Sequence, residues 1–378
     1  MSRQIENIVI LGGGSAGWLV AGVLASAYQL KSNHKLRITV VESPNVAALG
    51  VGEGTWPSMR ATLMSIGISE SEFIQQCDVS FKQGSQFVGW RDGAEADRYY
   101  HPFSLPLGLG EPHLYTALQK HGGGLAFAEA YSEQPAVCDA LRAPKQAGTA
   151  EYAGALNYGY HLDSVRFGKL LRDHCTQNLG VHHRVAHIER VISDDTGDIS
   201  ALQTTQRDEI AGDFFIDCSG THSRLLGEHF GIPFISKSDS SINDSAIALQ
   251  IPYNDDQAPI ASTTLATAQK AGWIWDIHLA SRRGIGHVFA SAFMSHDEAE
   301  HLLRNYISRD LGAAAIENLE ARHLKINAGY RAKPWHRNCV AVGMAAGFIE
   351  PLEASALVLV ELAAQYIRDE LPCSRQAM

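Results

Sequence analysis

A glycine-rich turn between an apolar strand and an apolar helix is the feature that most constrains how this chain folds. Residues 7–11 (NIVIL) predict a buried strand, residues 12–17 (GGGSAG) fit the pattern GxGxxG, and the apolar residues that follow recur at helical spacing. In such a turn Gly12 allows the tight bend, Gly14 lets the backbone approach a pyrophosphate, and Gly17 lets the helix pack on the strand. The sequence therefore predicts a dinucleotide-binding turn.

The residues around this turn complete the expected site. The helix begins with Ser15 and Ala16, and its N-terminus attracts phosphate charge. A second apolar strand, residues 36–42, ends in Glu42, at the position that binds a ribose hydroxyl in such folds.

Two apolar strands late in the chain favour FAD over a nicotinamide cofactor. Residues 214–220 and 338–347 each predict a strand that runs into a turn of small residues. An extended FAD takes contacts from both ends of its chain, whereas a nicotinamide domain usually completes its site within its first half. We therefore predict an α/β fold of the glutathione-reductase type, with a Rossmann-like FAD-binding domain and an interleaved, sheet-containing substrate module.

Composition narrows the class of partner. The formal net charge of −10 leaves no basic stripe, so we expect neither nucleic acid nor an acidic membrane surface to bind. No run of about 18 apolar residues occurs, so no transmembrane helix is expected. The six cysteines contain no CxxC pair, which favours reduced thiols and a cytoplasmic protein. His182, His183 and His187 lie in a strand-like stretch without a carboxylate partner, and we expect no metal site.

A pair of tryptophans lies in the stretch 271–279 (AGWIWDIHL). On a strand, Trp273, Trp275 and Ile277 share one face, while Ile274 and Asp276 point the other way. This alternation alone leaves two alternatives open, a packed sheet interface or the wall of a pocket.

Several motifs together resemble the flavin-dependent halogenases of the tryptophan halogenase family. The resemblance covers nearly the whole chain, and its carriers are residues 12–18 (GGGSAGW), 50–57 (GVGEGTWP), 81–84 (FKQG), 100–103 (YHPF), 273–277 (WIWDI) and 347–353 (GFIEPLE). It implies an enzyme that uses reduced FAD, oxygen and a halide ion (chloride or bromide) to make hypohalous acid, which halogenates an electron-rich aromatic substrate of the indole or tryptophan type. It also implies a separate flavin reductase, and a homodimer is compatible with the sequence.

The resemblance assigns catalysis to Lys82 and Glu353. Lys82 matches the essential lysine of the family, which holds hypohalous acid by a hydrogen bond or forms a haloamine. Glu353 matches the carboxylate that stabilises the developing ring cation and helps to take its proton; Glu350 lies near it, but the motif favours Glu353. Without the resemblance, a solvated lysine and a glutamate at a helix N-terminus are the simpler interpretations of these two residues.

Further residues follow from the same match. Trp273 and Trp275 form a wall that keeps the substrate from the flavin, although His278 stands where the family has proline. The halide site falls on the backbone of Ser355 and Ala356, where the family has threonine and glycine. Contacts to the cofactor are expected for Val51, Gly52 and Glu53 beside the isoalloxazine, Met344 and Leu357 at the flavin, and Val185 at the adenine.

We expect the FAD-binding domain to comprise residues 1–95, 150–230 and 331–378, with residues 96–149 and 231–330 as the substrate module. Family members continue beyond the last motif into a helical portion that closes over the substrate, and we expect this chain, which ends at residue 378, to lack it. Two alternatives stay open from the sequence. One is an FAD-dependent aromatic monooxygenase, and the other is a truncated flavin-binding protein without halogenase activity.

Overall fold

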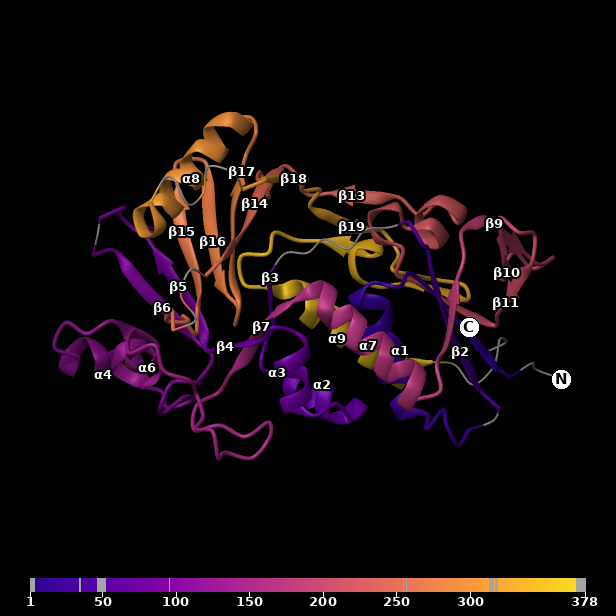
Figure 1. The fold of residues 1–378 in the computed structure, drawn as a ribbon, viewed down its shortest axis with the longest axis horizontal. Coiled ribbons are helices and arrows are strands. Elements are labelled where there is room, and N and C mark those ends of the chain that lie inside the picture. The colour runs from indigo at the N-terminus through magenta and orange to yellow at the C-terminus, as the bar shows by residue number, and fades with distance from the viewer. Residues whose placement is uncertain are drawn as a thin grey trace.

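The computed structural model describes residues 4–371 except 34, 46–51, 95, 254, 256, 313–315, 317 and 318. A mainly parallel sheet and a mainly antiparallel sheet lie toward opposite ends of an elongated molecule, and long helices occupy its middle (Figure 1). Among the described residues, no helix has the length and apolar character needed to span a membrane.

The glycine-rich turn lies at the carboxyl ends of the strands of the first sheet. The six strands of this sheet run in the order β20-β21-β12-β1-β2-β8, and all pair in parallel except β20. The strands are β1 (Asn7–Leu11), β2 (Arg37–Glu42), β8 (His182–Val185), β12 (Phe214–Asp217), β20 (Trp335–His336) and β21 (Cys339–Ala341). The strands expected near residues 7, 36, 214 and 338 are thus all present. Because β1 is central, the turn that follows it lies among the carboxyl ends of its neighbours, where ligands bind in such sheets.

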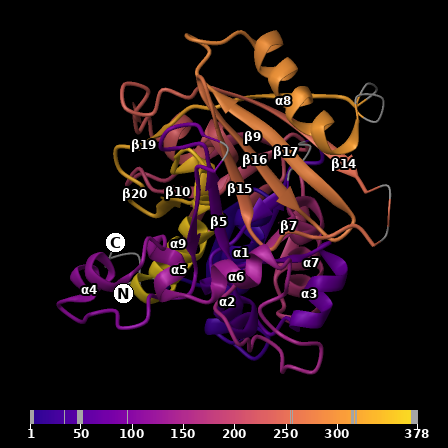
Figure 2. The ribbon, with the colours of Figure 1, turned by 90° about the vertical axis from the view of Figure 1, so that its left-hand side faces the viewer.

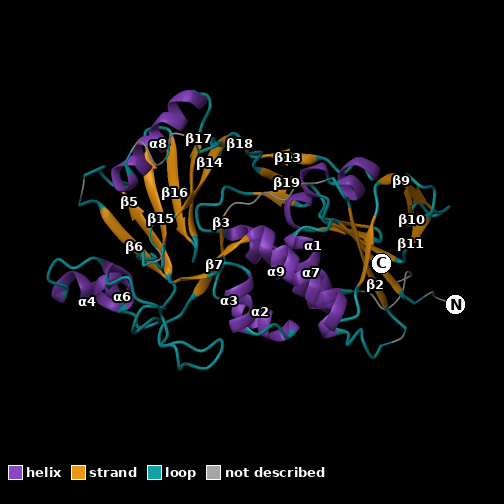
Figure 3. Ribbon diagram, in the orientation of Figure 1, coloured by secondary structure: helices purple, strands orange, loops and turns teal. Residues whose placement is uncertain are grey.

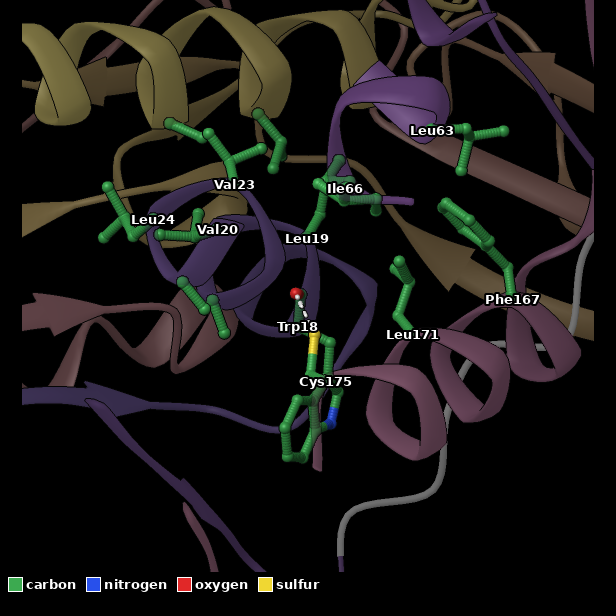
Figure 4. Packing of buried hydrophobic residues seen from close by; sticks show 14 of the residues in the cluster. Trp18, Leu19, Val20, Val23, Leu24, Leu63, Ile66, Phe167, Leu171 and Cys175 are labelled. Carbon is green, nitrogen blue, oxygen red and sulfur yellow. Dashed lines mark hydrogen bonds between the residues drawn. The ribbon is translucent and has the colours of Figure 1, made fainter. Parts of the chain in front are cut away.

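Long helices pack on this sheet through a continuous apolar core. They are α1 (Ser15–Ala27), α7 (Ser164–Asn178) and α9 (Ser355–Glu370). Between α1 and α7 lie the buried side chains of Trp18, Leu171 and Cys175, and the Cys175 thiol donates to the Trp18 carbonyl oxygen at 3.6 Å (Figure 4). Burial of these large side chains stabilises the domain by the hydrophobic effect.

The second sheet is mainly antiparallel and has seven strands in the order β18-β14-β17-β16-β15-β5-β6. They are β5 (Gly84–Val88), β6 (Arg98–Pro102), β14 (Ser245–Pro252), β15 (Thr264–Gln269), β16 (Gly272–His278), β17 (Arg282–Phe289) and β18 (Arg322–Lys325). Helix α8 (His296–Leu311) covers its outer face (Figure 2). The opposite face is turned toward the first sheet and its helices (Figure 1).

Short elements lie between the two large sheets and around them (Figure 3). The central ones form a three-stranded sheet, β3 (Gly52–Gly54), β7 (Gly159–Asp163) and β4 (Ser80–Lys82), flanked by α2 (Ser58–Ile66) and α3 (Glu70–Gln76). The remaining elements are α4 (Leu114–His121), α5 (Phe127–Tyr131), α6 (Gln134–Asp139), β9 (Ile188–Ser193), β10 (Ile199–Thr204), β11 (Glu209–Ala211), η1 (Gly220–His222), η2 (Arg224–His229), β13 (Phe234–Ser236), β19 (Gly329–Arg331), η4 (Gly343–Ala345) and β22 (Gly347–Phe348).

The sheet pairing bears on where the two domains divide. Strand β5 precedes the expected boundary at residue 95, yet it pairs with β15 and β6 of the second sheet. We therefore propose that the first FAD-binding segment ends before Gly84, because the hydrogen-bonded ladder holds β5 in the substrate module. The other expected boundaries stay as a proposal.

Candidate active site

The glycine-rich turn leaves open space at the N-terminus of α1. Gly12 has φ +126°, and a Cβ there would lie 2.1 Å from the Cys218 carbonyl oxygen. A Cβ on Gly17 would lie 2.0 Å from the Gly12 carbonyl oxygen, so the fold itself requires glycine at both positions. Gly14 differs, because a Cβ there would meet no described atom within 4 Å. The open side of the turn therefore fits a phosphate group.

Helices α1 and α9, which begin near the expected ligands, have no side-chain cap. Asp163 and Ser295 cap α7 and α8 by accepting hydrogen bonds from backbone N–H groups of the first turn. In contrast, α1 after Gly14 and α9 after Ala354 have neither a side-chain cap nor an acidic residue in the first turn. Their first backbone N–H groups are free to bind an anion. Ser15 in α1 instead donates its hydroxyl to the Ser164 carbonyl oxygen at 3.1 Å.

Glu42 is the last residue of β2, and its side chain lies against the glycine-rich turn. A Cβ on Gly13 would lie 2.4 Å from Glu42 Cγ, so the side chain packs directly on the turn. His183 Nε2 lies 2.8 Å from Glu42 Oε2, although neither atom forms a hydrogen bond within the described chain. The expectation that the histidines have no carboxylate partner is therefore wrong, because parallel pairing of β2 with β8 brings the two residues together. Among the described residues, no group of three or more side chains could hold a metal ion.

Three other expected cofactor residues differ in exposure. Val185 pairs with Glu42 and is 57% exposed, and Met344 on η4 is 41% exposed. A Cβ on Gly343 would lie 3.2 Å from Ala16 Cβ, so η4 lies against the start of α1. Leu357 is buried in the core beneath α9, and its side chain therefore packs inward.

Strand β3 brings Gly52 and Glu53 beside the second sheet. A Cβ on Gly52 would lie 3.2 Å from Ile277 Cγ2, so β3 passes directly over β16. Burial raises the pKa of Glu53 to about 7. Val51, which was also expected here, lies outside the described residues.

Lys82 ends β4 and is fully buried. Its Nζ has no hydrogen-bond partner among the described residues and lies 5.4 Å from the centre of the Phe103 ring. Burial lowers the pKa of Lys82 to about 8, although the Glu353 charge opposes this shift. The Gly54 Cβ position is 3.2 Å from Lys82 Nζ and 2.9 Å from Ala354 Cβ, so the ammonium lies close to the start of α9. A buried, unpartnered ammonium destabilises the folded protein, so its presence here favours a functional role.

Glu353 is fixed by contacts from three other segments. His101 Nδ1 lies 3.1 Å from Glu353 Oε1, and the Ser85 hydroxyl donates to Oε2 at 3.4 Å. The Trp56 indole N–H donates to the Glu353 carbonyl oxygen at 2.8 Å. The hydrogen bond to Glu353 raises the pKa of His101. Sequence reasoning missed these partners; Trp56 and His101 lie within the family motifs, but only the fold shows what they contact.

Ala354 follows Glu353 and has φ +53°, which turns the chain into α9. Ser355 and Ala356 form the first turn of that helix. The halide site expected at Ser355 and Ala356 thus coincides with an uncapped helix N-terminus close to the Lys82 ammonium. Anion binding is favoured at such a helix N-terminus.

The tryptophan pair lies on the inner face of the second sheet. Trp273 is 2% exposed and Trp275 is half-buried, with ring centres 6.3 Å apart. A Cβ on Gly286 would lie 2.1 Å from the Trp275 ring, so this ring lies across β17. Ile274, on the opposite face, packs in the apolar cluster under α8, as the alternation predicts.

A small cavity lies beside Trp275. It has a volume of about 130 Å³ and is lined by residues from β3 and from the second sheet, among them Gly52, Trp275, Gly284 and Arg322. The inner face of the second sheet and strand β3 therefore meet around Trp275. The Trp273 ring instead packs against Phe87 and Val288.

Comparison with known proteins agrees with this geometry. Residues 7–377 match the tryptophan halogenase family. Tryptophan 6-halogenase ThaL from Streptomyces albogriseolus is 32% identical over 389 residues, which cover 98% of this chain and 71% of that protein. Tryptophan 7-halogenase RebH from Lentzea aerocolonigenes is 31% identical over 392 residues, with 98% and 71% covered.

Solved structures show the same fold. A tryptophan halogenase from Shewanella frigidimarina superposes with a TM-score of 0.94 at 50% identity, covering 99% of this chain and 72% of that one. BrvH, a flavin-dependent halogenase from Brevundimonas sp. BAL3, has a TM-score of 0.85 at 31% identity, with 99% and 73% covered. The chain therefore belongs to the tryptophan halogenase family and is a flavin-dependent halogenase with a Rossmann-like α/β fold.

Proposed function

We propose that the chain uses reduced FAD, oxygen and a halide ion to halogenate an electron-rich aromatic ring of the indole or tryptophan type. The observation that carries this proposal is Lys82, a fully buried ammonium without a hydrogen-bond partner among the described residues. Lys82 lies beside Gly54. Gly54 also lies close to Ala354, the residue between Glu353 and Ser355. Family membership supports halogenation over hydroxylation by the same cofactor.

The residues around the glycine-rich turn fit FAD. The open side of Gly14 and the uncapped start of α1 suit a pyrophosphate, and the Glu42 carboxylate at the end of β2 suits a ribose. We propose that the pyrophosphate is held at Gly12, Gly14, Ser15, Ala16 and Gly17, the ribose at Glu42, the adenine at Val185, and the flavin at Val51, Gly52, Glu53, Met344 and Leu357. When bound in its reduced form, FAD supplies hypohalous acid from oxygen and halide.

Lys82 and Glu353 direct that oxidant to the substrate. The Lys82 ammonium holds hypohalous acid by a hydrogen bond, or its amine forms a haloamine with it. In the hydrogen-bonded form, a ring carbon bonds to the halogen while the halogen–oxygen bond breaks. The departing oxygen takes a proton from Lys82 and leaves as water, while Glu353 stabilises the ring cation and accepts the ring proton. Once Glu353 has released its proton and Lys82 has regained one, the sum is an aromatic C–H and hypohalous acid giving a carbon–halogen bond and water.

The tryptophan pair and the start of α9 complete the proposed site. We propose that Trp273 and Trp275 wall the substrate off from the flavin. The backbone N–H groups of Ser355 and Ala356 bind the halide at the start of α9.

Reduced FAD would come from a separate flavin reductase. We also propose a cytoplasmic location, which the free thiols of the described cysteines support.

The test is product analysis by mass spectrometry. Purified protein is incubated with FAD, a flavin reductase, a panel of indoles and phenols, and bromide, chloride or no halide. A brominated or chlorinated ring that appears only with halide and disappears in Lys82→Ala supports the proposal. Hydroxylated product that does not depend on halide would instead identify a monooxygenase. Normal FAD binding without any product would leave a flavin-binding protein.

A further inference from the structure

Trp273 is linked to the loop that carries Glu353. Its indole N–H donates to Glu350 Oε1 at 2.5 Å, and the Asn243 side-chain amide donates to the same oxygen at 2.7 Å. Trp273 is only 2% exposed, so this hydrogen bond forms largely away from solvent. Hydrogen bonds to a charged acceptor are stronger than neutral ones.

Apolar contacts fasten the same loop on both sides of Glu350. Phe348 and Leu352 pack against the cluster that contains Trp273, Phe87 and Val288. The loop from β22 to α9 is thus held on the inner face of the second sheet by two apolar side chains and, between them, by the Glu350 carboxylate.

Glu353 comes directly after this anchored stretch. Its carboxylate meets Ser85 and His101, which belong to β5 and β6 of the same sheet as Trp273. The side chain is 31% exposed, and it reaches Ser85 and His101 only while the loop backbone is held in place. A shift of the loop moves Glu353 and the start of α9 together, because Ala354 and Ser355 follow in the chain.

We infer that Trp273 and Glu350 form a positioning pair. This pair fixes the loop from β22 to α9, which carries Glu353, to the second sheet. This inference rests on the proposed function, and it gives the Trp273 indole N–H a second task beside the wall that the ring forms with Trp275. The rings of Trp273 and Trp275 form the wall, and the Trp273 indole N–H also holds Glu353 in register with its partners.

Variants that remove one partner of the contact test the inference. Trp273→Phe keeps most of the ring but removes the donor, Glu350→Ala removes the acceptor, and Glu350→Gln keeps an acceptor oxygen. We expect kcat for halogenation to fall by on the order of 10- to 100-fold in the first two, as displaced catalytic groups typically cause. The KM for the aromatic substrate should change little, and Glu350→Gln should recover most of the loss. The matched control is Trp90→Phe, because the Trp90 N–H donates at 2.9 Å to the Ala266 carbonyl oxygen and not to a residue of the loop.

A double-mutant cycle separates positioning from general damage. If Trp273 acts through Glu353, adding Trp273→Phe to Glu353→Gln should cause almost no further loss of kcat. Independent, multiplying losses would overturn the inference.

Hydrogen exchange gives a readout that does not depend on halogenation. Measured by mass spectrometry on the protein without substrate, residues 347–354 should exchange faster in Trp273→Phe and Glu350→Ala than in the wild type or Trp90→Phe. Unchanged exchange in both variants would overturn the inference even if the enzyme is active. If the wild type makes no halogenated product but the loop responds as expected, the proposed function fails while the loop anchor stands.

Discussion

Replacing Lys82 with methionine is expected to stabilise the protein and to abolish halogenation. Burial lowers the pKa of Lys82 from its usual 10.5 to about 8, so the folded state disfavours the ammonium that the unfolded chain carries freely. Each tenfold change in a protonation equilibrium corresponds to about 1.4 kcal/mol, so the charged form costs the folded protein about 3 kcal/mol at pH 7. Methionine has a similar length and no charge, and it should recover up to this amount.

The pH dependence identifies the cause of the effect. The folded state has the lower pKa, so the cost is complete below about pH 8 and fades as pH rises from 8 toward 10.5. The stability gain of Lys82→Met over the wild type should therefore be largest at pH 7 and less than half as large at pH 9.5. Urea denaturation at the two pH values measures both differences.

The control is Lys169→Met, because the Lys169 side chain is 65% exposed beside Asp173. Its effect on stability should stay within about 0.5 kcal/mol at either pH. The reasoning about burial is refuted if Lys82→Met is less stable than the wild type at pH 7, or if its gain is the same at pH 9.5. Wild-type halogenation in the folded variant, measured by mass spectrometry, would remove Lys82 from the mechanism.

Three further changes test other parts of the site. Gly14→Val should fold normally but lose FAD affinity in a fluorescence titration, because its side chain fills the open space of the turn; Gly148→Val, which also meets no described atom within 4 Å, is the control, and equal affinities would contradict the assignment. Trp275→Ala should release more hydrogen peroxide and hydroxylated product while retaining FAD; wild-type levels of both would make Trp275 ordinary core. Glu353→Gln should lower kcat by on the order of 10²-fold, comparable with losing one preorganised electrostatic contact, and an unchanged kcat would argue against its role.

Local pattern was enough to predict the framework of the nucleotide-binding domain. The strand at 7–11, the turn at Gly12–Gly17 and the following helix depend on residue spacing and on glycine conformation, which neighbours in the chain determine. The alternation of Trp273 and Ile274 between two faces follows from strand geometry in the same way. The roles of Lys82 and Glu353 came from resemblance to a family, because neither residue has a distinctive local pattern.

Only the tertiary structure decided which distant residues meet. Lys82 loses its solvent because Gly54 and Phe103 arrive from other segments, and Glu42 acquires His183 because β8 pairs with β2. Burial and pairing of this kind arise between segments far apart in the chain, so residue spacing carries no record of them. The hydrogen bond from Trp273 to Glu350 is the clearest case, since the sequence shows an aromatic pair and an acidic loop but not that one holds the other.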